Sequence, residues 1–259
     1  MMLHLGSMGW SYEHWVGNFF PAGTKHEMFL KEYSEHFDTV EVDNTFYGIP
    51  SPSTVRRWRE ETPEGFLFSA KFPRSITHET FSAGTAEKRD IFLRNISLLG
   101  SKLGPLLLQF QPSFGPENTG VLKDFLSDLP EGFRLALEIR DKEWLRDGFY
   151  SLLRDKGTAL ALVEAPWMPV VEEVTSSFIY VRWEGDRRRV QGALGRVEVD
   201  RINEISKWAQ RVRGYLDDSL EVFGYFSKFF SGHPPTDTSS SSISSECNSS
   251  KRNQALATV

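Results

Sequence analysis

Apolar residues recur at every second position in five separate stretches of the chain, and each stretch carries a charged or amide residue in the opposite phase near its end. The stretches cover residues 39–43, 67–71, 106–111, 135–140 and 179–184. Alternate side chains of a β-strand point to opposite faces, so Val40 and Val42 would take one face while Glu41 and Asp43 take the other. Parallel strands with this layout would gather their polar groups at one end of a sheet.

Further apolar stretches complete a set of eight expected strands, over residues 3–7, 40–43, 66–72, 106–110, 135–139, 159–163, 178–183 and 220–226. Helical spacing predicts helices over residues 25–37, 53–60, 85–99, 118–129, 142–156 and 200–212. Strands that alternate with helices predict an α/β fold with a parallel sheet, and eight such units in about 230 residues fit a single (β/α)8 TIM-type barrel. The link between strands six and seven is expected to be a loop, because its stretch at 170–175 is too short for a full helix.

We expect one barrel domain over residues 1–235, followed by a Ser-rich segment over residues 236–259. Four consecutive serines, at 239–242, lie where the eighth helix of a barrel should form. Serine competes for backbone hydrogen bonds, so a short or irregular final helix is expected, and the last residues could complete it or be mobile.

Composition limits the classes of function. Hydrophobic residues make up 39% of the chain and charged residues 25%, which is typical of a soluble globular protein. The net charge of −5 does not indicate a nucleic-acid partner, although a local basic groove stays possible. One cysteine, Cys247, excludes an internal disulfide, and no apolar run approaches the roughly 20 residues of a membrane span. A cytoplasmic protein that does not bind membranes is expected, and its oligomeric state stays open.

Several motifs carry a resemblance to a known family. They are the strings at 9–21 and 40–47, Lys71 followed by Thr77 and His78, Gln109 with 112–114, 138–140 with Trp144, and 180–182 with Gly185. Together they resemble the domain-of-unknown-function 72 family, the YecE-like barrels, in the family's order over roughly residues 5–226. The resemblance implies a TIM-type barrel and brings no established reaction.

The chain departs from the pattern of that family in three places. The resemblance implies Asn where this chain has Asp43, His where it has Glu184, and Asn-Asn where it has Ser227 and Lys228. If these positions carry function, the chemistry or the ligand of this chain would differ from that of its relatives.

Glu41 and Glu138 are the first candidates for catalysis, because strands two and five lie on opposite sides of a barrel. Two carboxylates across a pocket could serve as acid and base, as in glycoside hydrolysis. They could also bind a metal, or form ion pairs with Lys71, Arg140 and Arg182 in the same layer. Lys71 could form a Schiff base with a carbonyl substrate, although nearby acids would keep it protonated.

Other polar residues are candidates for ligand binding. Arg140 and Arg182 suit a carboxylate or phosphate group, because arginine offers two parallel donors, or else they pair with the glutamates. Gln109 ends another strand in the same layer. A basic run at 187–189 follows strand seven, where barrels often bind phosphate, although a solvated loop is the simpler interpretation.

Aromatic residues follow the ends of strands one and two. Trp10, Tyr12 and Tyr47 could stack on a sugar or a base at the catalytic face, or could pack on one another as a lid.

Metal and cofactor chemistry are only weakly indicated. His78 could join Glu41, Asp43 and Glu138 around a divalent metal ion, but metal-binding spacings are absent, as is any nucleotide cofactor motif.

The polar ring and the aromatic loops favour an acid/base enzyme, of hydrolase or isomerase type. Its ligand would be a polar, anionic or polyhydroxylated small molecule such as a sugar or a phosphate-containing compound. The alternative is a non-catalytic ligand-binding or scaffolding barrel whose polar ring is a structural network of ion pairs. Fold alone does not decide between them.

Overall fold

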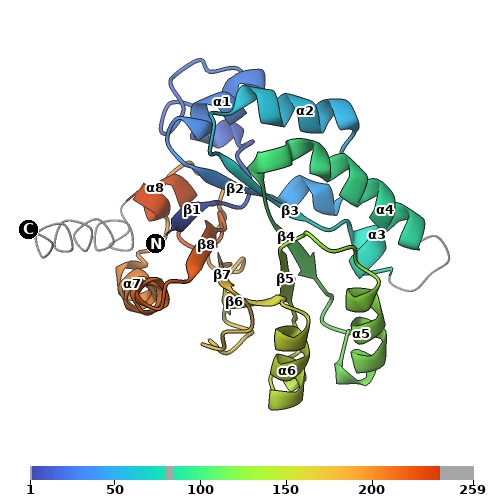
Figure 1. Ribbon diagram of the computed structural model, residues 1–259. Coiled ribbons are helices and arrows are strands. Elements are labelled where there is room, and N and C mark those ends of the chain that lie inside the picture. Colours follow the sequence, from blue (N-terminus) through green and yellow to red (C-terminus); the bar gives the residue numbers. More distant parts are fainter. Residues whose placement is uncertain (1, 80–84, 240–259) are drawn as a thin grey trace, which may run out of the picture.

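The sheet of this protein curls into a nearly closed barrel (Figure 1). The computed structural model describes residues 2–79 and 85–239. Eight parallel strands lie within these residues: β1 (Leu3–Ser7), β2 (Thr39–Val42), β3 (Leu67–Lys71), β4 (Leu103–Gln109), β5 (Leu135–Glu138), β6 (Ala159–Glu164), β7 (Phe178–Trp183) and β8 (Glu221–Phe226). Hydrogen-bonded neighbours follow the order β1-β8-β7-β6-β5-β4-β3-β2, so the seam lies between β1 and β2. The predicted (β/α)8 TIM-type barrel is confirmed.

A short contact closes the seam. Met8 and Glu41 form an isolated parallel bridge, and the Gly9 N–H donates to the Glu41 carbonyl at 2.8 Å. Gly6 stands where the two strands come closest, because a Cβ atom there would lie 2.2 Å from the Thr39 carbonyl oxygen. Glycine at this position therefore permits the close approach of the two backbones.

Helices follow most strands and cover the outside of the barrel (Figure 1). They are α1 (Phe29–Ser34), α2 (Pro52–Glu61), α3 (Arg74–Thr77), α4 (Thr85–Ile96), α5 (Thr119–Ser127), α6 (Asp147–Asp155), α7 (Ile202–Asp217) and α8 (Pro234–Ser239, as far as the chain is described). Short 3₁₀ helices lie at Glu13–Trp15, His26–Met28, Asp43–Phe46, Ser97–Lys102, Pro116–Asn118 and Lys142–Trp144.

Local sequence explains where these helices form. Ser51 caps α2, its hydroxyl accepting from the Thr54 N–H at 3.1 Å, and Pro52 occupies the first turn, where no N–H is needed. Helix α7 buries Ile205, Trp208 and Val212 at helical spacing against the sheet. Helix position is thus set by a cap and an apolar stripe.

Two predicted helices are longer than the α-helices found in the structure. The helix expected over 25–37 is a 3₁₀ turn at His26–Met28 and an α-helix that ends at Ser34. The helix expected over 142–156 is interrupted at Arg146, whose φ of −152° and ψ of 158° are extended. Apolar spacing shows which residues are buried. A loop that packs on the same core can have the same spacing although its backbone is not helical.

The link between β6 and β7 has no helix in residues 165–177, as expected. Thr175 secures it instead, accepting from the Leu160 N–H at 2.7 Å and donating to the Thr158 carbonyl at 2.8 Å. This side of the barrel is covered by loop.

The core has two apolar layers separated by the sheet. Outward-facing strand residues pack against the helices in one large cluster. The barrel interior holds a smaller cluster that includes Leu107, Phe178, Tyr180, Phe223 and Tyr225. Above these rings, toward the C-terminal ends of the strands, the interior becomes polar.

The predicted boundary between residues 235 and 236 falls inside α8, and residues 240–259 lie outside the described part of the chain. The division into a barrel and a Ser-rich segment therefore stays a prediction. In residues 2–79 and 85–239, no helix is both long and apolar enough to cross a membrane.

Candidate functional site

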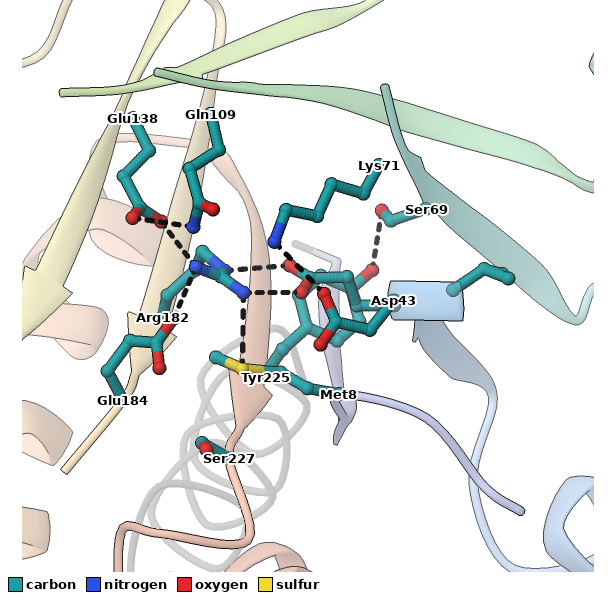
Figure 2. Close-up of polar contacts among 12 residues, drawn as sticks. Met8, Asp43, Ser69, Lys71, Gln109, Glu138, Arg182, Glu184, Tyr225 and Ser227 are labelled. Carbon is teal, nitrogen blue, oxygen red and sulfur yellow. Dashed lines mark hydrogen bonds and ion pairs between the residues drawn. The ribbon is translucent and has the colours of Figure 1, made fainter. Parts of the chain in front are cut away.

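Arg182 lies at the centre of the polar layer and is 1% exposed (Figure 2). Its guanidinium donates to both carboxylate oxygens of Glu41, at 3.0 and 2.8 Å, and to Glu184 Oε1 at 2.6 Å. It also donates to Glu138 Oε2 and contacts the Met8 sulfur at 3.3 Å. One cation therefore holds three carboxylates that come from strands β2 and β5 and from the end of β7.

Glu138 is fully buried and surrounded by donors. Gln109 Nε2 donates to Glu138 Oε1 at 2.7 Å, and Arg140 Nε donates to the same oxygen at 2.9 Å. Burial alone would raise the pKa of this carboxyl, but Arg182, Arg140 and Lys71 together lower the pKa to about 2. Glu138 is therefore a carboxylate at neutral pH.

Glu41 is equally buried but differs in its surroundings. Its Oε2 accepts a hydrogen bond from the Tyr180 hydroxyl at 2.7 Å as well as from Arg182. Burial outweighs the attraction of Arg182 and raises the pKa of the Glu41 carboxyl above its usual value, with the Asp43 charge adding to the rise. The two glutamates thus share a cation yet hold their protons with different strength.

Asp43 and Lys71 form a second pair at the upper edge of the layer. Lys71 Nζ lies 3.2 Å from Asp43 Oδ1 and 4.2 Å from the centroid of the Phe46 ring. The lysine side chain is 7% exposed, whereas that of Asp43 is 40% exposed. Burial would raise the pKa of Asp43, but Lys71 and Arg182 outweigh it and lower that pKa. Asp43 therefore presents an ionised carboxylate toward solvent.

An open cleft of about 390 Å³ lies above this layer. Four loops line it: Trp10 and Tyr12 after β1, Asp43, Asn44 and Tyr47 after β2, Arg187 after β7, and Lys228 and Phe229 after β8. Glu41, Glu138 and Arg182 are buried below and do not line the cleft. Asp43 is the carboxylate of the polar layer that lines this cleft.

The three aromatic candidates are placed differently. Trp10 is 9% exposed and packs edge-on against Trp58, with ring centroids 5.7 Å apart. Tyr12 is half-buried, and its hydroxyl donates to the Met8 carbonyl at 2.6 Å. Tyr47 is 79% exposed and free to present a ring face to a ligand.

His78 packs beside Phe46, with ring centroids 4.9 Å apart, and its Nδ1 is hydrogen-bonded to the Thr77 hydroxyl at 3.0 Å. Burial, Lys71 and Arg140 lower the pKa of His78. In the described residues, no group of three or more His, Cys, Asp or Glu side chains is arranged to hold a metal ion. A metal that His78 shares with Glu41, Asp43 and Glu138 has no support in this geometry.

All four residues that depart from the family pattern, in its three places, lie at this site. Glu184 contacts Arg182, and Asp43 pairs with Lys71. Ser227 is buried, with its hydroxyl accepting from the Phe229 N–H at 3.2 Å, while Lys228 lines the cleft.

Tyr180 and Phe229 were not among the site residues expected from the sequence, although residues 180–182 belong to the motifs that resemble the family. Tyr180 could have been found, because it lies two residues before Arg182 and so on the same face of β7. Phe229 follows a strand in a loop, where no periodicity marks it.

The comparisons with known proteins agree with this fold. The sequence pattern of the family described as "Protein of unknown function DUF72" matches residues 4–246. The UPF0759 protein YecE of Escherichia coli (strain K12) is 33% identical over 147 residues, which are 57% of this chain and 52% of YecE. The UPF0759 protein YunF of Bacillus subtilis (strain 168) is 31% identical over 180 residues, which are 64% of this chain and 61% of YunF. The chain thus aligns with a little over half the length of these relatives.

Two solved structures have the same barrel. A DUF72 family protein from Thermotoga maritima superposes with a TM-score of 0.79 and 25% identity, over 96% of this chain and 100% of that one. A DUF72 family protein from Enterococcus faecalis superposes with a TM-score of 0.74 and 22% identity, over 95% and 98% of the two chains, which shows the fold alone. With its sequence matched over nearly its whole length, this chain belongs to the DUF72 family of proteins of unknown function.

Proposed function

We propose that this protein is an enzyme that binds a polar, anionic or polyhydroxylated small molecule in the mouth cleft and acts on it by acid/base chemistry. One observation carries the proposal. The cleft receives a single partly exposed carboxylate from the polar ring, Asp43, and that carboxylate is backed at 3.2 Å by the buried ammonium of Lys71. A charged group that is positioned by an opposite charge at the edge of an open cleft is typical of acid/base sites.

The two members of the pair suit different roles. Asp43 is ionised at neutral pH and could accept a proton from a substrate hydroxyl or C–H group. The Lys71 ammonium lies beside the Asp43 carboxylate and could stabilise negative charge that develops on the substrate. Phe46 packs under the ammonium and fixes its position.

Glu41 and Glu138 enter this proposal through Arg182. Because both are fully buried and bonded to the guanidinium, they fix the position of that cation beneath the cleft. That they act directly as acid and base stays a prediction, and direct action would require them to exchange Arg182 for a substrate group.

The test uses proton exchange, which needs no knowledge of the product. The protein is incubated in D₂O with a panel of sugars, polyols, hydroxy acids and their phosphates, and NMR follows both conversion and deuterium entering substrate C–H positions. We expect the wild type and the surface control Asp124→Asn to be active. We expect Asp43→Asn and Lys71→Met to lose at least about 100-fold in rate. Wild-type rates in Asp43→Asn would overturn the proposal.

A second function, ligand binding without catalysis, is favoured because the buried carboxylates of the polar layer already have hydrogen-bond partners within the protein. Arg182 bonds to three buried carboxylates. Gln109 and Arg140 donate to the other oxygen of Glu138, and Tyr180 donates to a Glu41 oxygen that Arg182 also contacts. A binding protein would be stabilised against heat by a panel compound that it never converts or deuterates. That result would replace the enzyme proposal with this one.

A further inference from the structure

Two cations flank one aromatic ring at the rim of the cleft. Arg187, after β7, places its guanidinium carbon 4.7 Å from the centroid of the Phe229 ring. Lys228, after β8, places its Nζ 5.2 Å from the same centroid and 5.4 Å from that of Tyr12. Because both cations are measured to one ring, they lie within about 10 Å of each other.

These two cations are less closely paired with carboxylates than Lys71, Arg140 and Arg182 are. Lys71, Arg140 and Arg182 each lie close to a carboxylate. Within residues 2–79 and 85–239, by contrast, Lys228 Nζ makes no hydrogen bond or ion pair. Arg187 approaches Glu184 Oε2 only at 3.9 Å, and its side chain is 67% exposed.

The surroundings of Lys228 make an anion a favourable partner. The residue is partly buried, and its ammonium lies over two rings that offer cation–π attraction but no hydrogen-bond acceptor of full charge. A partly desolvated ammonium gains most from a charge-assisted hydrogen bond. Arg187 adds a planar donor that can bind two oxygens of one group.

Resting on the proposed function, we propose that Arg187 and Lys228 bind the phosphate group of a phosphorylated small-molecule substrate. Two cations match the double negative charge of a phosphate monoester better than the single charge of a carboxylate. The cleft, at about 390 Å³, is within the range of roughly 300–1,000 Å³ that is usual for small-molecule sites.

The rest of the substrate would extend from the β7 and β8 loops toward the β2 loop. Asn44 and the exposed ring of Tyr47 line that part of the cleft and suit hydroxyl groups and a sugar face. Asp43 repels a phosphate and so favours the orientation in which the anion lies at Arg187 and Lys228. The phosphate would thus position the substrate, and the β2 side would carry the chemistry.

Binding is tested by calorimetry with inorganic phosphate, a hexose phosphate and the free hexose at constant ionic strength. The variants are Arg187→Gln and Lys228→Gln, with Arg188→Gln as the matched control. Arg188 belongs to the same loop but is held by Asp186 at 3.1 Å and does not line the cleft. We expect each cleft variant to weaken phosphate binding about 10-fold or more, the double variant to abolish it, and the control to bind as the wild type does.

The outcomes separate this inference from the proposed function. Equal phosphate affinity in wild type, Arg187→Gln and Lys228→Gln, or no binding by the wild type, would overturn the phosphate site. Loss of turnover in Asp43→Asn together with unchanged phosphate affinity in both cleft variants would leave the enzyme proposal standing alone. Weakened phosphate binding in the cleft variants with full turnover in Asp43→Asn would leave the phosphate site standing alone.

Discussion

Arg182 is the side chain on which the polar layer depends. Replacing it with Met leaves Glu41 and Glu138 buried without their shared cation. Breaking a buried ion pair by removing one partner costs about 3–5 kcal/mol, since the remaining charge is uncompensated. We expect Arg182→Met to lose that much free energy of unfolding in urea.

The matched control is Arg213→Met, on the exposed side of α7. A surface substitution of this kind changes stability by about 0.5 kcal/mol or less. If Arg182→Met were as stable as Arg213→Met, the ring would not be held together by its central cation.

Glu138 makes the stability of the protein depend on pH. Its pKa in the folded protein is about 2, below the usual 4.5, so its stabilising effect is present above pH 4.5 and is lost as the pH falls toward 2. We expect the stability difference between wild type and Glu138→Gln, from urea unfolding, to shrink across that window. If the stabilities of the two proteins changed with pH in parallel, the pKa of Glu138 would not be lowered by folding.

The β7 and β8 loops form an element-scale support for the cleft, and Gly185 is where they touch. Its φ is +71°, and a Cβ atom there would lie 2.1 Å from the Phe229 carbonyl oxygen. Alanine would therefore be strained and would push the two loops apart. We expect Gly185→Ala to lose about 2 kcal/mol or more in urea unfolding.

Gly214→Ala is the control for that measurement. Gly214 lies in α7, is exposed, and has open space around a Cβ atom. Because alanine restricts the unfolded chain and favours the helix, it should raise stability by roughly 0.5–1 kcal/mol. A Gly185→Ala protein that gained stability in the same way would contradict the close contact of the loops.

Helix ends are the element-scale feature that periodicity could not locate. The buried faces of α2, α4, α5 and α7 follow from apolar spacing, because packing requires one apolar stripe. The break at Arg146 depends instead on local backbone conformation, which apolar spacing does not record.

At the scale of the whole molecule, a charged cluster fastens the N-terminal end of the barrel. His4 of β1 bonds to Asp38 at 2.8 Å and to Glu221 at 3.2 Å, and it stacks on Phe223. Arg134 also reaches Glu221, at 2.6 Å. The cluster ties the starts of β1, β2, β5 and β8 together, far from the cleft.

This cluster should make stability fall as the pH rises above 6.5. Burial lowers the pKa of His4, but hydrogen bonds and charge from Asp38 and Glu221 outweigh burial and raise that pKa above 6.5. The stabilisation is therefore complete below pH 6.5 and is lost as the pH rises through the folded-state value. We expect the stability advantage of wild type over His4→Gln to decrease in that direction.

NMR titration of the His4 ring protons measures the same pKa directly. Asp38→Asn should move the His4 titration to lower pH, because it removes one carboxylate partner. A His4 that titrates at or below pH 6.5 in the wild type would contradict the cluster's role.

The alternation of apolar and polar residues along the strands is enough to predict the strands and the polar layer of the barrel from sequence alone. Period-two alternation identifies the strands, and the opposite phase near their ends places Glu41, Gln109, Glu138 and Arg182 in one layer, because parallel strands end on the same side of a barrel. The sequence therefore determines which strand side chains share this layer.

Only the tertiary structure decides which of them bond to one another and which face solvent. Glu41 and Glu138 are sealed around Arg182, whereas Asp43 and Lys228 open onto the cleft. Those differences arise from distances of a few ångströms between loops that are remote in sequence, and no local pattern encodes such distances. The alternation of residues along a strand specifies a face, while exposure and pairing depend on what the rest of the chain places against it.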